Sequence, residues 1–258
     1  MRRERLLGTA LEIAVPIALL GLWALWSAGT DTYYFPPLTD ILTTFRETWL
    51  FDRVGSDVVP SLVRLGLGFG IACVAGVTAG MALGLSPTLR RVTDPVVQFL
   101  RAIPPPALLP FGILVLGVGT SMKVFIIAFV CVWPVLLNTV DGIAGVDPTL
   151  RETTRVYGVG ARDRLLRVML PAATPQIFAG MRTSLSLALI LMVISEMVAS
   201  TNGIGYFVLQ SQRTFAIPEM WSGILLLGIL GYALNGTFVM IERRVLRWHR
   251  GARASALS

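Results

Sequence analysis

Charged and chemically reactive side chains are scarce in this chain of 258 residues. Only 14% of the residues are charged, against about 25% in ordinary soluble domains, and 54% are hydrophobic. The mean hydropathy is +0.71. A disordered chain needs low hydrophobicity, so that class is excluded. The composition predicts a membrane protein with several spans.

Histidine, cysteine and lysine are almost absent. The single histidine is His249, and the two cysteines, Cys73 and Cys131, lie in apolar runs. These counts exclude a disulfide framework, a metal site built on cysteine or histidine, and a Ser-His-Asp triad. The only lysine, Lys123, follows Met122, whereas a phosphate-binding loop requires Gly-Lys-Ser/Thr. We therefore expect no cofactor and no metal, and any ATP must be bound by a partner subunit.

Six apolar segments approach the length of about 20 residues that spans a bilayer. They run over residues 8–28, 62–85, 96–116, 122–140, 177–199 and 221–241. The first follows Arg2, Arg3 and Arg5, as a signal peptide does, but its length and its tryptophans favour an uncleaved span. The third is the least regular, because Pro104, Pro105 and Pro106 interrupt it. The sequence predicts an all-α polytopic protein with about six transmembrane helices.

The net charge of +7 and the pI of about 10.2 fit a nucleic-acid binder as well as basic loops beside membrane spans. With the N-terminus in the cytoplasm, 17 of the 22 basic residues lie inside, and the other five are Arg46, Arg53, Arg64, Lys123 and Arg213. The positive-inside rule therefore predicts that both termini are cytoplasmic. Basic loops account for the charge, and we expect no nucleic-acid partner.

Two stretches between spans are longer than turns, within a single domain of residues 1–258. Residues 29–61 are expected outside and contain apolar positions at helical spacing over Thr39–Leu50. Two interpretations fit that helix: it lies on the membrane surface, or it packs as a lid on neighbouring spans. Residues 142–176 are expected inside and carry most of the functional information.

The inside stretch predicts two short helices joined at a glycine. Asp147 is a suitable N-cap residue with Pro148 at the first helical position, and Gly158 and Gly160 break the helix. A second helix over Ala161–Met169 places Leu165, Leu166 and Met169 on one face and three arginines toward water or head groups, and Pro171 is expected to end it. Two helices held in this way form a rigid projection suited to docking on a partner.

The residues of this stretch resemble the EAA loop of ATP-binding-cassette (ABC) importer permeases. That loop has the form Glu-Ala-Ala-x3-Gly-x9-Ile-x-Leu-Pro, and the matching positions here are Glu152, Thr153, Thr154, Gly158, Val168, Leu170 and Pro171. Every spacing agrees. The two threonines replace alanines and Val168 replaces isoleucine, and all three are small enough to keep the helix packing.

Other stretches resemble the nitrate/sulfonate/taurine branch of these permeases: residues 35–41, 101–105, 134–139, 195–197, 203–206 and 242–248. The resemblance implies a type I, MetI-like permease in the bacterial cytoplasmic membrane. It also implies two ABC ATPase subunits, an external solute-binding protein and a second permease copy, most simply in a homodimer. It implies uptake of a small anion such as nitrate, a sulfonate or bicarbonate, or alternatively of a vitamin precursor or aromatic acid.

Site residues follow from the resemblance and from polar groups in the spans. The loop residues would couple the permease to the ATPases, with Glu152 as a polar anchor and Gly158 permitting the turn and close approach. Glu196 lies in an apolar run, where it lines a pathway or gate, pairs structurally with Arg213, or acts as a cap near the outer surface. Ser195 and Asn138 either line the pathway or bond between helices. Arg101 either offers charge to an anion or extends to the head groups.

Close helix packing is expected at six glycines of the second predicted span: Gly66, Gly68, Gly70, Gly76, Gly80 and Gly84.

Three other classes of function compete with an importer permease. An ion-driven carrier should show ionisable groups at membrane depth and internal repeats, and only Glu196 fits. A membrane enzyme should show convergent reactive groups at that depth, and none is present. A scaffold without transport is left as a third class.

Overall fold

The computed structural model describes residues 14–15, 18, 21–27 and 33–247 of the chain. Within this part the protein is helical and contains no strand, as the composition predicts. The elements are α2 (Leu38–Glu47), α3 (Val59–Leu85), α4 (Pro87–Ala102), α5 (Leu108–Leu116), α6 (Thr120–Ala144), α7 (Pro148–Val156), α8 (Ala161–Arg164), α9 (Leu170–Val198), α10 (Ile204–Arg213) and α11 (Ile217–Val245). Most of the first predicted span, residues 8–28, lies outside the described residues.

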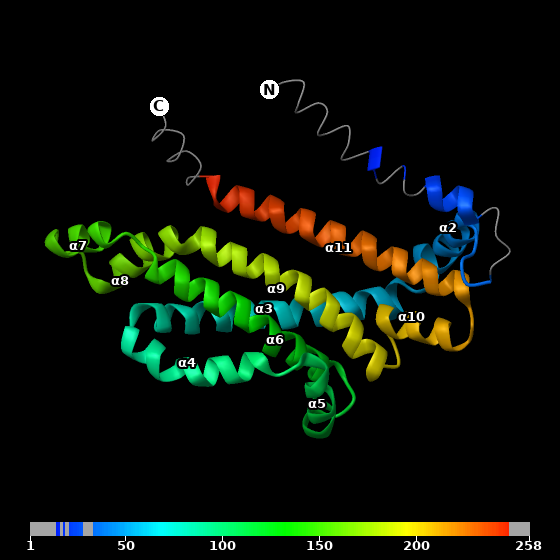
Figure 1. The fold of residues 1–258 in the computed structure, drawn as a ribbon, viewed down its shortest axis with the longest axis horizontal. Helices are drawn as coiled ribbons and strands as arrows, with labels where there is room; N and C mark the ends of the chain where they lie inside the picture. The colour runs from blue at the N-terminus through cyan, green and yellow to red at the C-terminus, as the bar shows by residue number, and fades with distance from the viewer. Residues whose placement is uncertain (1–13, 16–17, 19–20, 28–32, 248–258) are drawn as a thin grey trace.

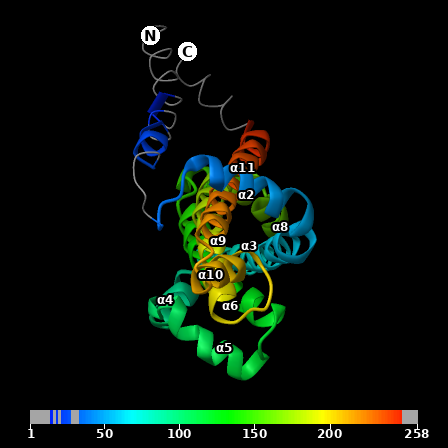
Figure 2. The same cartoon turned by 90° about the vertical axis from the view of Figure 1, so that its right-hand side faces the viewer.

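Long helices lie along one axis, and the short elements gather at its two ends. In Figure 1, α7 and α8 lie at one end of the molecule and α2 and α10 lie toward the other, while α5 lies below the long helices, short of that end. Figure 2 views the second end, where α10 lies close to α9. The stretch that carries α7 and α8 therefore lies at the end of the bundle opposite α2 and α10.

Four described segments are long and apolar enough to cross a membrane: Val54–Leu85, Thr120–Ala144, Ala161–Val198 and Ile217–Val245. They correspond to four of the six predicted spans. The third predicted span is not one straight helix, because α4 and the segment Pro105–Leu116 meet at 82°. The triple proline explains the bend, since proline lacks the backbone N–H and its ring clashes with the preceding helical turn.

Small residues on α3 bring α6 into close contact with it. A Cβ added to Gly76 would lie 2.7 Å from Val135 Cβ, and one added to Gly80 would lie 2.6 Å from Thr139 Cβ. Neither separation leaves room for a methyl group, so these glycines set the distance between the helices. Gly68 and Gly84 make equivalent contacts.

Within the described residues the packing prediction does not hold for Gly66 and Gly70, since no atom there lies within 4 Å of an added Cβ. They lie on the other side of α3, because close packing follows a repeat of four residues from position 68. Only the glycines on that repeat face α6.

The helix near residues 39–50 packs on its neighbours, in agreement with the lid interpretation. Ile41 on α2 and Trp49, just beyond it, are buried, and Trp49 Nε1 donates a hydrogen bond of 3.1 Å to Ser222 Oγ on α11. The Trp49 ring also meets the Phe207 ring of α10 edge-on, with centroids 4.7 Å apart. Residues 36–58 are thereby fixed against α10 and α11.

Candidate functional site

The projecting segment, residues 147–171, begins as the sequence predicts. Asp147 caps α7, its carboxylate accepting a hydrogen bond of 2.8 Å from the Thr149 N–H. At the other end Gly158 has φ of +67°, and the N–H groups of Gly158 and Val159 donate to the carbonyls of Arg155 and Thr154. This paired bonding is a Schellman motif, which needs a residue in the left-handed region and so favours glycine.

The base of the projecting segment is anchored to α6 and α9. Met169 is buried with Ile143, Val146, Ala173 and Ile177 in one apolar cluster. The Arg151 guanidinium, on the first turns of α7, donates to the Ile143 carbonyl near the end of α6. The projecting segment is therefore tied to two long helices.

Two details of the second short helix differ from the prediction. Pro171 does not end a helix, because α8 continues through a π-helical turn, Leu165–Met169, into α9. In that turn the Leu170 N–H donates to the Leu165 carbonyl five residues back, and this wider turn accommodates the proline ring in the next position. Leu166 does not share the buried face of Met169 and is 48% exposed.

The tip of the projecting segment is apolar and exposed. Val156 is 85% exposed and Tyr157 is 81% exposed, directly before Gly158. Glu152 and Thr153 are exposed too, whereas Thr154 is buried and donates to the Arg151 carbonyl. Val168, Leu170 and Pro171 are half-buried at the base. The sequence prediction did not include Val156 and Tyr157, although they lie within the x3 stretch of the motif.

Glu196 lies in a buried polar cluster at the opposite end of the bundle. Its side chain is completely buried near the end of α9. Arg64 Nη1 donates to Oε1 at 2.7 Å, Ser61 Oγ lies 2.8 and 2.9 Å from the two oxygens, and the Gly205 N–H donates to Oε2 at 3.0 Å. Of the structural interpretations of Glu196, the one that invoked an ion pair therefore named the wrong partner: the ion pair is with Arg64 of α3 and not with Arg213.

The polar cluster also caps the start of α10. The Gly203 N–H donates to Asp57 at 2.7 Å and the Ile204 N–H donates to Ser61 at 3.0 Å. Gly203 has φ of +112°, and a Cβ added there would lie 2.5 Å from both Glu196 carboxylate oxygens. Asp57, just before α3, and side chains of α3 and α9 thus satisfy the first N–H groups at the start of α10 and join three helices.

The sequence analysis missed Asp57, Ser61 and Arg64 as members of this cluster. Their spacing of four and three residues places them on one face of a helix, and Arg64 lies inside a predicted span. Those two observations would have been sufficient to predict that they act together. Asn202, which accepts hydrogen bonds from Arg64, follows the helix end and carries no such pattern.

The other polar pathway candidates of the spans bond to groups other than Glu196. Ser195 is buried and donates to the Met192 carbonyl of its own helix. Asn138 on α6 accepts a hydrogen bond of 2.9 Å from Gln176 on α9, which is the interhelical bonding considered for it. A role of either residue in the pathway stays a prediction.

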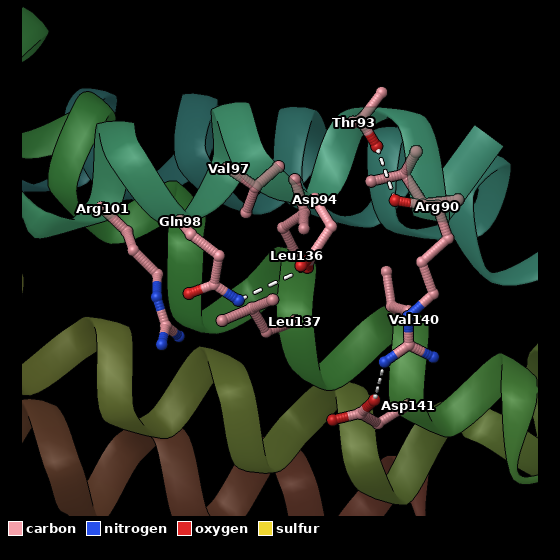
Figure 3. A pocket seen from close by; sticks show the side chains of 11 residues that line it. Arg90, Thr93, Asp94, Val97, Gln98, Arg101, Leu136, Leu137, Val140 and Asp141 are labelled. Carbon is pink, nitrogen blue, oxygen red and sulfur yellow. Dashed lines mark hydrogen bonds and ion pairs between the residues drawn. The ribbon is translucent and has the colours of Figure 1, made fainter.

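Arg101 lines a cavity of about 200 Å³ between α4 and α6. Figure 3 shows Arg90, Gln98 and Arg101 reaching from α4 toward this space. Arg90 donates to Asp141 at 3.2 Å and Gln98 donates to Asp94 at 3.3 Å. Among the described residues the Arg101 guanidinium has no ion-pair partner, so it is available to a group that enters the cavity.

Comparison with known proteins decides the family. The family model described as "Binding-protein-dependent transport system inner membrane component" matches residues 72–247, a range that includes the whole projecting segment. The chain belongs to this family. It is a multi-pass membrane protein and a permease component of an ABC importer, which works with ATPase and binding-protein partners.

Curated relatives of this permease cover nearly its whole length. It is 29% identical to the putative aliphatic sulfonates transport permease protein SsuC of Bacillus subtilis, over 92% of this chain and 86% of that protein. It is 30% identical to the bicarbonate transport system permease protein CmpB of Synechococcus elongatus, over 95% and 92%. It is 28% identical to the nitrate import permease protein NrtB of Leptolyngbya laminosa, over 93% and 91%.

A solved structure shares the fold of the permease. A chain of the MetNI methionine ABC transporter, in an inward-facing conformation, aligns with a TM-score of 0.66 at 20% identity, over 73% of this chain and 94% of that one. The MetI-like fold predicted from the EAA resemblance is therefore confirmed.

Proposed function

We propose that this permease carries a small anion through the bacterial cytoplasmic membrane by alternating access. The three relatives transport different anions, namely sulfonates, bicarbonate and nitrate, and this range supports the anion class without selecting one member. A vitamin precursor or an aromatic acid is the alternative cargo. The separate solute-binding protein would do most of the selecting.

One observation carries the coupling part of the proposal: an exposed apolar tip on a firmly anchored projection. Val156 and Tyr157 expose most of their surface at the end of α7. An exposed pair of this kind is typical of a docking site, where aromatic anchors contribute much of the binding energy. We infer that the tip enters a groove of an ABC ATPase, with Glu152 making a polar contact beside it and Gly158 setting the turn.

ATP would be bound and hydrolysed only by the partner subunits, because the single lysine of the chain does not follow a glycine. Closure of two ATPases would pull on α7, and the anchor at Met169 and Ile143 would pass that displacement to α9 and α6. We propose a homodimeric permease as the simplest assembly. The mass of the purified complex would check that stoichiometry.

Orientation follows from the same assignment. Arg151, Arg155, Arg162, Arg164 and Arg167 gather on the projecting segment, which supports a cytoplasmic location for that end and for both termini. The polar cluster around Glu196 would then lie toward the outer face. Because it joins α3, α9 and α10, we infer that Glu196 acts in an outer gate, while Arg101 lines the pathway nearer the inner mouth.

The test of coupling compares two equally exposed tyrosines. Tyr157→Ala removes the tip of the projection, and Tyr232→Ala removes an 85% exposed ring from α11, so neither change opens a cavity inside the chain. In the complete complex, we expect Tyr157→Ala to lower solute-stimulated ATPase activity at least tenfold, corresponding to about 1.4 kcal/mol or more. Tyr232→Ala should leave that activity within twofold of wild type.

A bulky change at Gly158 extends the same experiment. Gly158→Val should abolish the stimulated ATPase activity, because the left-handed backbone at this turn disfavours valine. Membrane insertion should stay intact, because an added Cβ meets no atom of the described residues. Full coupling in both Tyr157→Ala and Gly158→Val would contradict the docking proposal.

A further inference from the structure

Lys123, the only lysine of the chain, is buried and poorly satisfied. Its side chain lies in the first turns of α6, and the residue is 2% exposed. An ammonium group has three N–H donors, and its one hydrogen bond to the described residues goes to the Gly119 carbonyl at 3.1 Å. Among the described residues no ion pair includes Lys123. A buried cation without a counter-ion is costly and marks a functional position.

Arg64 adds a second incompletely used cation beside Lys123. Its Nη atoms bond to Glu196 and Asn202, but its buried Nε has no hydrogen-bond partner within the part of the chain that the structure describes. One helical turn after Arg64 and Lys123, α3 and α6 are in contact, since a Cβ added to Gly68 would lie 2.6 Å from Ile127 Cγ2; the two cations therefore lie along the same helix–helix seam. Asp57, the other buried carboxylate, is engaged by Arg53 and by the Gly203 N–H. Two buried cations therefore share one carboxylate, which leaves a local excess of positive charge.

Neither the stability of the fold nor the orientation of the spans in the membrane explains why Lys123 is buried at the start of α6. The N-terminal end of a helix carries partial positive charge, so a lysine in the first turns of α6 is in an unfavourable position. A lysine that only marks membrane topology extends its ammonium to water or head groups, whereas Lys123 is enclosed by the bundle. The unpaired N–H groups of Lys123 and Arg64 are suited to the oxygen atoms of an anion.

The location connects this excess charge with transport. Arg64 lies near the start of α3, Lys123 near the start of α6 and Glu196 near the end of α9, at the end of the bundle opposite α7 and α8 (Figure 1). Under the proposed orientation, this is the side from which the solute arrives.

We propose that Lys123 and the Nε–H of Arg64 form an entry site for the transported anion, closed in this conformation and opened when α3, α6 and α9 separate. This inference rests on the proposed function. The anion supplies the missing negative charge as it passes, and Glu196 keeps Arg64 in position before and after it. Lys123 is therefore a residue that contacts cargo in transit, and not a docking or ATPase-coupling residue.

The test uses the complete complex with its ATPase and binding protein in proteoliposomes. Uptake of radiolabelled nitrate, bicarbonate and taurine is measured together with ATPase activity stimulated by the loaded binding protein. Lys123→Met removes the charge, Lys123→Arg keeps it, and Lys123→Gln keeps a hydrogen-bond donor for the Gly119 carbonyl. Met122→Leu, a change at a fully buried neighbour, is the packing control.

We expect uptake by Lys123→Met and Lys123→Gln to fall at least tenfold while stimulated ATPase activity stays within twofold of wild type. Lys123→Arg should restore most of the uptake, and Met122→Leu should preserve both activities. Wild-type uptake rates in either neutral variant would overturn the inference, as would a parallel loss of uptake and ATPase activity in Lys123→Gln. If the wild-type complex transports none of the three anions, the proposed anion cargo itself fails and the entry site with it.

Discussion

The substitution Gly203→Ala tests how tightly the polar cluster depends on one backbone position. Gly203 has φ of +112°, a conformation that essentially only glycine adopts, and forcing alanine into it costs about 1–3 kcal/mol. The added Cβ would lie 2.5 Å from both Glu196 oxygens. The carboxylate must therefore move by roughly 1 Å to reach ordinary van der Waals contact.

Movement of that carboxylate breaks hydrogen bonds that the cluster cannot replace. The bonds at risk come from the Gly205 N–H and from Ser61, and a hydrogen bond to a charged group contributes about 1.5–3 kcal/mol. Losing one of them in addition to the backbone strain lowers the free energy of unfolding by about 2.5–6 kcal/mol. At about 2–4 °C per kcal/mol for a chain of this size class, Tm falls by about 5–24 °C.

The assay is thermal unfolding of the purified permease in detergent, followed by loss of the monodisperse peak in size-exclusion chromatography. Gly66→Ala is the matched control, since nothing lies within 4 Å of an added Cβ on that helix, and its Tm should stay within about 2 °C of wild type. In a Glu196→Ala background, Gly203→Ala should cost only the strain of about 1–3 kcal/mol. Two results would refute the dependence on Gly203: the same loss of unfolding free energy for Gly203→Ala in the Glu196→Ala background as in wild type, or an unchanged Tm for Gly203→Ala alone.

Two further predictions concern other parts of the molecule. Gly80→Ala should lower the free energy of unfolding by about 1–3 kcal/mol, because the new methyl group meets Thr139 Cβ at 2.6 Å. Gly70→Ala is the control: its methyl group meets no atom of the described residues, so the Tm measured in the same thermal assay should stay nearly unchanged. Val156→Cys introduces a thiol at an 85% exposed position. This thiol should react with a membrane-impermeant maleimide in inside-out vesicles and not in right-side-out vesicles. The reverse pattern would disprove the proposed orientation.

Much of the projecting segment was predictable because its determinants are local. The Asp147 cap, the Pro148 start and the glycine turn at Gly158 depend on residues within a few positions of each other. The continuous passage from α8 into α9 was not predictable from Pro171, since the π-helical turn that accommodates the proline depends on how Met169 packs against α6 and α9.

Composition and hydrophobic length by themselves determined that this chain is a helical membrane protein, and the spacing of residues 152–171 carried the resemblance to the EAA loop of importer permeases. Hydrophobic length, basic loops and a spaced pattern of small and acidic residues are properties of the chain as written, so they need no knowledge of packing. Only the tertiary structure decided that Glu196 pairs with Arg64, that Gly203 adjoins its carboxylate and that Lys123 is buried beside them. Residues 64 and 196 lie 132 positions apart, and helix periodicity specifies which face a side chain occupies but not which distant helix that face meets.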